Sequence, residues 1–300
     1  MIRWIKRGAF YLLFVLDPWV YIRKIPLLNK FKLGIGLGRL VRRVFFYPKK
    51  IVNLLLVGGI YFETNIYGTK ISMIDDRTFD YYTHISQGKI YEPALALRLK
   101  TLLKDYDSPT FVDIGAHYGY FTIYAGKLIG TRGQVISIEP HKRYYIRLLK
   151  NIQINGLKGN IRTFNLALSD KEGHANMEGW DERVLHEVRN GDVQVITFDQ
   201  LCKRENIRPD IIKIDVHGAE GKVLAGMSDT LKNKVSHLFC ELHDDLLGYT
   251  IREIIQILEV AGLEVFEFTK HRDVSGGGLA PISSDFLSHY DDRMLYARRY

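Results

Sequence analysis

The residues best placed to do chemistry are two acids, each at the end of an apolar run. Asp113 closes a run that begins at Phe111, and Glu139 closes the next run, 26 residues later. Gly115 and Gly119 follow Asp113 and allow a sharp turn and a close backbone approach, because neither carries a Cβ atom. Parallel sheets bind ligands outside the carboxyl ends of their strands. We therefore expect both carboxylates to face one crevice, with helix capping as the alternative role.

The spacing of these residues indicates which nucleoside-containing cofactor the site would bind. The pattern D-x-G-x-x-x-G differs from the G-x-G-x-x-G of dinucleotide-binding folds. An acid at the turn would repel a pyrophosphate, which such folds hold at a helix N-terminus. S-adenosylmethionine has a ribose, an adenine and a zwitterionic tail but no phosphate, so it fits better. Glu139 is expected to accept hydrogen bonds from the ribose hydroxyls.

A second group of polar residues follows two later apolar runs. Lys213 lies inside the run 211–214, where an unpaired charge is costly. Asp215 falls on the same face of the strand, which predicts a Lys–Asp ion pair. Glu241 and His243 share one face at the end of the next strand, and histidine can act as a general base near neutral pH.

The composition is that of an ordinary globular protein. The 300 residues, 46% hydrophobic and 25% charged, leave room for one large α/β domain and an appendage. The two cysteines, Cys202 and Cys240, lack metal-ligand spacing, so each is expected to pack as a small apolar residue in a reducing compartment. We therefore expect a cytoplasmic protein.

The basic charge is concentrated at the N-terminus. Residues 1–57 hold 12 lysines and arginines against one acid, Asp17. The apolar run 9–22 is too short for a membrane-spanning helix and is interrupted by Asp17-Pro18. Basic residues mixed with aromatic ones favour peripheral attachment to an anionic membrane surface. The alternatives are a helical subdomain packed on the core, nucleic-acid binding and, least favoured, a signal peptide.

The rest of the chain alternates between strand and helix patterns, which predicts a mostly parallel sheet. We divide it into a β-hairpin and helix lead-in at 58–107, with the helix over 92–104, and a main domain at 108–300. Strands are expected near 110–115, 134–139, 161–167, 193–198, 210–216 and 235–241, and helices near 118–129, 141–155, 219–232 and 250–262. Residues 263–269 and 294–299 predict a closing antiparallel hairpin.

An ordered set of motifs resembles the FkbM family of S-adenosylmethionine-dependent methyltransferases. The matching pieces are spread over residues 110–268: D-I-G-A-H-Y-G-Y from Asp113, Ile138-Glu-Pro, Asn151 to Asn155, Ala167 to Asp170, Ile196 to Asp199, Ile212 to Glu220, and Glu241-Leu-His243. The resemblance implies a class I Rossmann-like methyltransferase fold and methyl transfer to a hydroxyl, often on a sugar or polyketide.

The resemblance also implies roles for individual residues. Those expected at the cofactor are Asp113, Gly115, His117, Gly119, Glu139, Ala167, Ser169 and Asp170. Those expected near the transferred methyl group or the acceptor are Asp215, His217, Glu220, Glu241 and His243. The family commonly has Asn at the position of His117 and Glu at that of His217, so the chemistry at these two positions is open.

We predict an O-methyltransferase that acts on a sugar, a glycolipid or another small molecule. His243 or His217 would accept the hydroxyl proton, and Asp215 and Glu241 would orient that histidine. Alternatively, Asp215, Glu241 and His243 would bind a divalent cation that lowers the pKa of the hydroxyl. The competing functions are a catalytically altered, membrane-associated scaffold that binds the cofactor, and a nucleic-acid methyltransferase. The latter is disfavoured because Asp215-Val-His-Gly lacks an N-P-P-Y-like turn.

Overall fold

The computed structural model describes residues 60–75, 89–178, 184–187, 190–243, 248–269, 272, 277–287 and 293–299. Contacts divide the chain into two units, Met1–Tyr61 and Phe62–Tyr300, and the fold below is that of the second unit. The prediction for the basic segment 1–57 lies outside the described residues, and the proposed domain boundaries stay a prediction. Among the residues described, no helix is both long enough and apolar enough to cross a bilayer.

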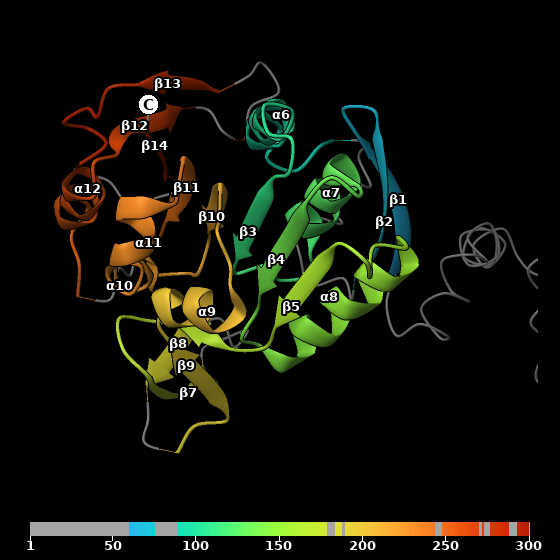
Figure 1. The fold of residues 1–300 in the computed structure, drawn as a ribbon, viewed down its shortest axis with the longest axis horizontal. Helices are drawn as coiled ribbons and strands as arrows, with labels where there is room; N and C mark the ends of the chain where they lie inside the picture. Colours follow the sequence, from blue (N-terminus) through green and yellow to red (C-terminus); the bar gives the residue numbers. More distant parts are fainter. Residues whose placement is uncertain are drawn as a thin grey trace, which may run out of the picture. The chain divides into compact units, whose positions relative to one another are not determined.

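An eight-stranded sheet forms the centre of the domain (Figure 1). Its strand order is β13-β12-β14-β11-β10-β3-β4-β5. The five strands from β11 to β5 run parallel, which confirms the predicted parallel core. Their bounds are β3 Thr110–Ile114, β4 Gln134–Ile138, β5 Ile161–Phe164, β10 Ile211–Ile214 and β11 His237–Leu242.

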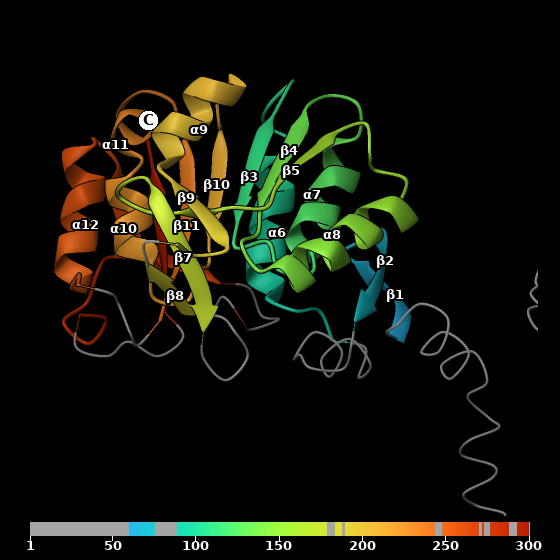
Figure 2. The same ribbon diagram turned by 90° about the horizontal axis from the view of Figure 1, so that it is seen from below.

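Helices cover both faces of this sheet (Figure 2). One face packs on α6 Pro93–Leu102, α7 Tyr120–Ile129 and α8 Lys142–Ile154. The other face packs on α9 Phe198–Glu205, α10 Glu220–Ala225, α11 Ser228–Asn233 and α12 Ile251–Val260. Side chains alternate between the two cores along each strand, as Phe111 and Val112 do in β3. Cys202 and Cys240 are free, buried thiols, as predicted.

The C-terminal strands close the sheet with antiparallel pairings. β14 Arg293–Arg298 lies between β11 and β12 Glu264–Thr269 and is antiparallel to both, which confirms the predicted hairpin. A short strand, β13 Gly278–Ala280, extends the sheet beyond β12 and was not predicted.

A second, four-stranded sheet follows β5 in sequence, in the order β6-β9-β7-β8. The predicted strand 161–167 ends early, and the chain enters this sheet as β6 Ala167–Leu168. β9 Val193–Ile196 was predicted as a strand, whereas β7 Gly173–Glu178 and β8 Val184–Glu187 were not. β7 carries Gly, His, Asn and Glu, which are not residues that favour strands as a group, so the sequence signal was weak.

A two-stranded hairpin, β1 Ile60–Ile66 and β2 Thr69–Asp75, precedes α6, as predicted. Its turn places Tyr67 and Gly68 at positive φ, the backbone form of tight hairpin turns. Ile71 and Met73 of β2 are fully buried in the same core as α7 and α8. The hairpin is therefore an integral part of the domain.

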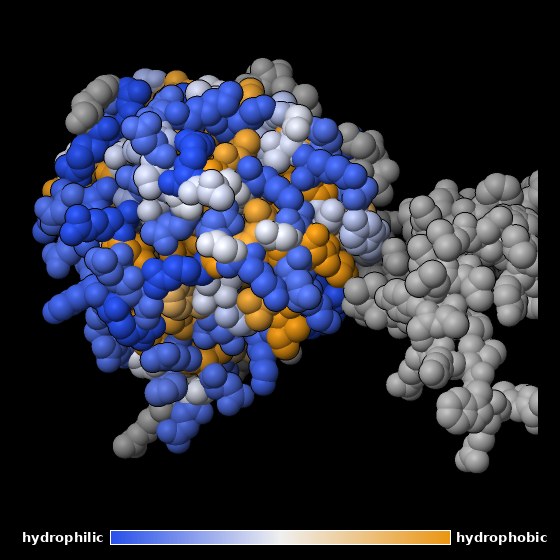
Figure 3. Space-filling view, turned by 45° about the vertical axis from the view of Figure 1, so that its right-hand side comes forward, coloured by the Kyte–Doolittle hydropathy of each residue, from blue (hydrophilic) through white to orange (hydrophobic). Residues whose placement is uncertain are grey.

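The surface seen in Figure 3 shows hydrophobic residues in separate patches among hydrophilic ones. The large apolar side chains most exposed to solvent include Ile146, Leu149 and Ile154 of α8. Scattered apolar side chains of this kind are normal on a folded domain and do not by themselves indicate a docking surface.

Candidate active site

The turn after β3 lies directly against the turn after β10. Gly115 has φ +79, and a Cβ atom added there would lie 1.8 Å from the backbone oxygen of Asp215. The amide of Asp215 donates a hydrogen bond to the carbonyl of Ile114 at 3.0 Å. Gly115 therefore allows the two strand ends to meet, and this contact brings the glycine turn next to the second group of polar residues.

Asp113 is placed differently from the prediction. Its side chain is 1% exposed, and Thr122 Oγ1 of α7 donates a hydrogen bond to its carboxylate at 2.6 Å. Ser137 of β4 is hydrogen-bonded to the same hydroxyl at 2.8 Å. The carboxylate lies beneath the crevice rather than facing into it, because the α7 side of the sheet supplies its hydrogen-bond partner. Burial raises its pKa, and the charge of Lys213 and the Thr122 bond partly offset that rise.

A row of buried polar groups crosses the sheet at this level. Ser137, Asp113 and Lys213 occupy the same register on β4, β3 and β10, and all three point toward the α6–α8 face. The ammonium of Lys213, 4% exposed, lies 5.3 Å from the centre of the Phe121 ring. These three side chains therefore form a polar layer, with one acid and one base, inside an otherwise apolar core.

Glu139 lies at the mouth of the crevice, at the end of β4, as predicted. Its two oxygens accept hydrogen bonds from the backbone amides of His117, at 2.7 Å, and His141, at 2.8 Å. The carboxylate is thereby fixed between the turns after β3 and β4. Burial raises the pKa of Glu139 to about 7, although the two amides favour the charged form.

The other residues predicted at the cofactor have different surroundings. The ring of His117 lies 4.0 Å from that of Tyr118 and 4.3 Å from that of Tyr144, measured between ring centres. Ala167 is buried and lines the cavity described below. Ser169 is buried and donates a hydrogen bond to the exposed Asp170, and neither residue lines that cavity.

One cavity opens at the carboxyl ends of β3, β4 and β10. It joins the Gly115 turn and Glu139 to Asp215 and His217, so the structure brings the two predicted groups of residues together. Its full lining is Ile114, Gly115, Ile138, Glu139, Pro140, His141, Tyr144, Leu166, Ala167, Leu168, Met177, Asp215, Val216, His217 and Ala219. The lining combines two carboxylates, Glu139 and Asp215, with apolar side chains, which suits a ligand with both polar and apolar parts.

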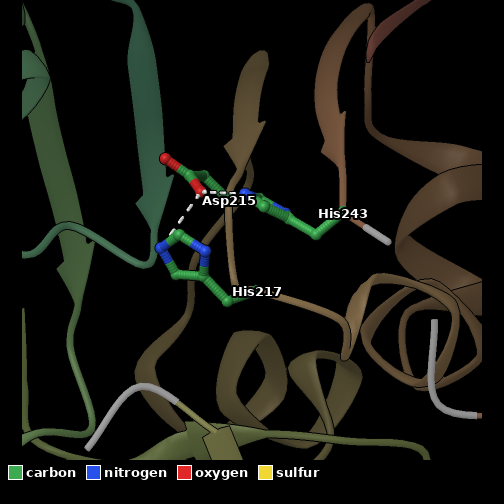
Figure 4. A group of neighbouring side chains, drawn as sticks. All are labelled: Asp215, His217 and His243. Atoms are coloured by element: carbon green, nitrogen blue, oxygen red, sulfur yellow. Dashed lines mark ion pairs between the residues drawn. The ribbon is translucent and has the colours of Figure 1, made fainter. Parts of the chain in front are cut away.

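Asp215 forms the predicted ion pair and also faces two histidines (Figure 4). Lys213 Nζ donates to Asp215 Oδ2 at 2.9 Å. The other oxygen, Oδ1, lies 3.6 Å from His243 Nε2 and 4.0 Å from His217 Nε2. Burial alone would raise the pKa of Asp215, but the positive charge of Lys213, aided by the two histidines, lowers it.

Glu220 is hydrogen-bonded to His243 on the ring nitrogen that does not face Asp215. Its Nδ1 lies 2.9 Å from Glu220 Oε1, and Glu220 is fully buried at the start of α10. The amide of Gly218 donates to the same oxygen at 3.1 Å. Burial alone would lower the pKa of His243, but the bond to Glu220 and the charge of Asp215 raise it to about 9.

Glu241, predicted beside His243, interacts elsewhere. Its Oε1 accepts a hydrogen bond from Arg272 at 2.7 Å. The described residues that could jointly hold a metal ion are Asp215, His217 and His243. The structure therefore brings His217, rather than Glu241, next to Asp215 and His243. Strand alternation predicted Glu241 and His243 on one face, but His243 follows the last residue of β11 and turns toward α10.

Glu92, which was not among the predicted site residues, lies close to this group. It is 2% exposed and precedes α6 at φ 42, and within the described part of the chain neither of its carboxylate oxygens has a hydrogen-bond partner. Burial raises its pKa, as do the charges of Glu241 and Asp215, so the side chain belongs electrostatically to this site. Its position before Pro93 is that of an ordinary acid at a helix N-terminus, and the sequence offered no other signal. Tyr144 and Met177 of the cavity lining were missed as well.

The comparison with known families decides the classification. The family described as "Methyltransferase FkbM domain" matches residues 113–265, about half of the chain. The chain belongs to the FkbM methyltransferase family. This confirms the resemblance, and the doubly covered sheet with its antiparallel β14 is the predicted class I methyltransferase fold. The match begins at Asp113 and includes both polar groups of the site.

Three proteins similar to this FkbM chain share little sequence identity with it. The hexuronic acid methyltransferase AglP of Haloferax volcanii is 25% identical over 164 residues, which cover 53% of this chain and 64% of AglP. The structure of methyltransferase FkbM from Methylobacillus flagellatus is 18% identical, with a TM-score of 0.44, and the match covers 64% of this chain and 44% of that one. The O-methyltransferase of Bacillus cereus in complex with SAH is 14% identical, with a TM-score of 0.41 over 69% and 81% of the two chains. The chain thus spans less than two thirds of the length of the first two.

Proposed function

We propose that this FkbM chain transfers the methyl group of S-adenosylmethionine to a hydroxyl of a sugar or another small molecule. The single observation that carries the proposal is the shared cavity. Glu139 stands at one part of it, and Asp215 and His217 stand at another, across the close contact at Gly115. A nucleoside site and a site able to handle an acceptor proton therefore adjoin.

The residues present fit S-adenosylmethionine. The carboxylate of Glu139 is fixed by two backbone amides and keeps lone pairs for the ribose hydroxyls. Leu168 and Met177 give an apolar surface suited to the adenine. Asp113 and Asp215 place negative charge near the turn, which favours a ligand with an ammonium and a sulfonium and disfavours a pyrophosphate.

Bound S-adenosylmethionine supplies a methyl group already activated by its sulfonium. The chain must hold the acceptor oxygen in line with that methyl group and take charge of the hydroxyl proton. Asp215, His217 and His243 are the groups that the structure offers for this task. Since the pKa of His243 is about 9, this ring is protonated near neutral pH and would accept a proton directly only in alkaline solution.

Two observations bear on the chemical class of the acceptor: the negative charge of the site and the substrate named for one relative. AglP is named as a hexuronic acid methyltransferase, and a hexuronic acid carries both hydroxyls and a carboxylate. The pKa of Asp215 is lowered by Lys213, so this carboxylate keeps its negative charge at the site and would oppose the approach of a second carboxylate. We therefore favour a neutral hydroxyl as the acceptor oxygen.

Transfer of labelled methyl groups tests this function. The wild-type chain, incubated with methyl-labelled S-adenosylmethionine and a panel of mono- and oligosaccharides, should label at least one acceptor. Asp215→Asn should lower the transfer rate by at least about a hundredfold, because the carboxylate takes part in handling the acceptor proton. His174→Ala, a change at an exposed residue of β7, should leave the rate unchanged. Cofactor binding with no transfer to any acceptor would instead favour the scaffold alternative.

A further inference from the structure

We propose that Asp215, His217 and His243 form a binding site for one divalent transition-metal ion. These residues come from the ends of β10 and β11, two neighbouring parallel strands. Binding of the ion is independent of methyl transfer, whereas its role in catalysis rests on the proposed function.

Three ligand atoms converge on one point in space (Figure 4). Asp215 Oδ1, His217 Nε2 and His243 Nε2 all lie within 4.8 Å of one another. Two of the separations, 3.6 and 4.0 Å, involve Asp215 Oδ1. Metal–nitrogen and metal–oxygen bonds are about 2.0–2.2 Å long, so small side-chain movements would bring all three atoms into coordination.

Hydrogen bonds from neighbouring side chains orient two of these ligands, His243 and Asp215. Glu220 binds Nδ1 of His243, which leaves Nε2 directed at Asp215. Such a carboxylate–histidine pair is the usual outer support of a metal-bound imidazole, since it fixes the ring and its tautomer. Lys213 binds Oδ2 of Asp215 in the same way and leaves Oδ1 for a ligand.

The free oxygen of Asp215 is itself unsatisfied. Oδ1 is buried, and no group in the described part of the chain donates a hydrogen bond to it. A buried carboxylate oxygen without a donor is costly, and a cation at this point would remove that cost. The Nε2 atoms of the two other proposed ligands, His243 and His217, lie 3.6 and 4.0 Å from this oxygen.

The donor set indicates the class of metal. Two imidazole nitrogens and one carboxylate suit zinc, iron, cobalt or nickel better than magnesium or calcium, which prefer oxygen ligands alone. Three protein ligands leave further positions open, as in catalytic sites. The side chain of His217 is 38% exposed and lines the cavity, so a small ligand can reach those positions.

The role of such an ion would be to bind the acceptor hydroxyl. A hydroxyl coordinated to the ion has a lowered pKa and can release its proton to solvent at the exposed edge of His217. The alkoxide that remains would face the cofactor part of the same cavity. This gives the site a means of activation at neutral pH.

Cobalt(II) titration of the untagged, full-length protein tests the site without cofactor or acceptor. We expect one Co²⁺ per chain, visible as d–d absorption bands, and competition by Zn²⁺. His217→Ala and His243→Ala should each weaken binding by more than about a hundredfold, and Glu220→Gln by about tenfold. His174→Ala, at an exposed histidine of β7, should bind as the wild type does.

Two results would overturn the inference: no Co²⁺ or Zn²⁺ binding in the micromolar range, or binding that survives both histidine replacements. Circular dichroism spectra that match the wild type would show that the variants are folded, and His217, being partly exposed, is the safer replacement. Metal binding without methyl transfer would leave this inference intact and contradict the proposed function. Methyl transfer by metal-free protein, unchanged by chelator, would contradict the role of the ion in catalysis and leave both the metal site and the proposed function intact.

Discussion

At the scale of the residue, the carboxylate of Glu139 is both hydrogen-bonded by backbone amides and buried. Its oxygens are anchored by the amides of His117 and His141, and the group is almost fully buried. Burial, with smaller contributions from Asp113 and Asp215, raises the pKa of Glu139 from its ordinary value of 4.5 to about 7. The side chain therefore changes charge in a pH range where the protein can be studied.

Cofactor affinity should consequently depend on pH. Only the ionised carboxylate accepts hydrogen bonds from both ribose hydroxyls, and it predominates above pH 7. As pH falls through the pKa of Glu139, protonation competes with binding, so the Kd for S-adenosylmethionine should rise about tenfold between pH 8 and pH 6. Isothermal titration calorimetry over this range measures the effect. A Glu139→Gln variant should bind weakly with a flat profile, and a flat profile in the wild type would contradict the assignment.

Lys213 supplies the positive charge that balances the buried acids of the site. Burial would lower its pKa, but the carboxylates of Asp215, Asp113 and Glu92 raise it. Replacing Lys213 by Met should lower the free energy of unfolding by about 3–5 kcal/mol, because it leaves these carboxylates buried without a counter-charge.

Urea denaturation followed by circular dichroism measures this loss. The matched control is Lys222→Met on the half-buried first turn of α10, where a change below about 0.5 kcal/mol is expected. Equal stability of the Lys213 variant and the wild type would show that the buried acids are neutral rather than paired.

At the scale of the element, two asparagines attach the β1–β2 hairpin to the domain, one within α8 and one at its C-cap. Asn151 Oδ1 accepts from the amide of Ile74 at 2.8 Å, and its Nδ2 donates to the carbonyls of Ile74 and Tyr118. One turn later, Asn155 binds the amide and the carbonyl of Ser72. These side chains thus make the backbone hydrogen bonds that a neighbouring strand would otherwise make to β2.

Removal of one of these anchors should be costly. Asn151→Ala leaves the buried amide and carbonyl of Ile74 without partners, which should cost about 3 kcal/mol of unfolding free energy. Hydrogen exchange should show faster exchange at Ile74, while the exposed Gln153→Ala on the same helix has little effect. Unchanged exchange at Ile74 would mean that apolar packing alone holds the hairpin.

Element boundaries show where tertiary contacts override the sequence pattern. The predicted helix 219–232 is two helices, because Gly226 packs against the carbonyl of Ser169, where a Cβ atom would come within 2.0 Å. The second helix, α11, receives its N-terminal cap from Asp199, which accepts from the amides of Asp229 and Thr230. A cap supplied by a residue 30 positions away leaves no local signal.

One missed helix did have a local signal. Thr197 and Gln200 form a reciprocal capping box at the start of α9, a pattern readable from T-x-x-Q. The predicted strand 193–198 instead ran past Thr197 into the first residue of this helix, Phe198.

At the scale of the whole molecule, the parallel core and both polar groups followed from the sequence, since strand ends and turn glycines are local features. Their convergence could be expected from the rule that ligands bind at carboxyl strand ends. The burial of Asp113 and Glu92 and the pairing of Glu241 with Arg272 depend on packing between distant segments. The sequence pattern contains no record of those contacts.

Calorimetric titration with S-adenosylmethionine tests the central claim most directly, with three variants beside the wild type. The wild type should bind one cofactor per chain, and Gly115→Ala and Glu139→Gln should each weaken binding by at least about tenfold. Gly68→Ala is the matched control, since Gly68 shares the positive φ of Gly115 but has open space around it. Absence of binding in the wild type, or undiminished binding in both site variants, would contradict the placement of the cofactor between β3, β4 and β10.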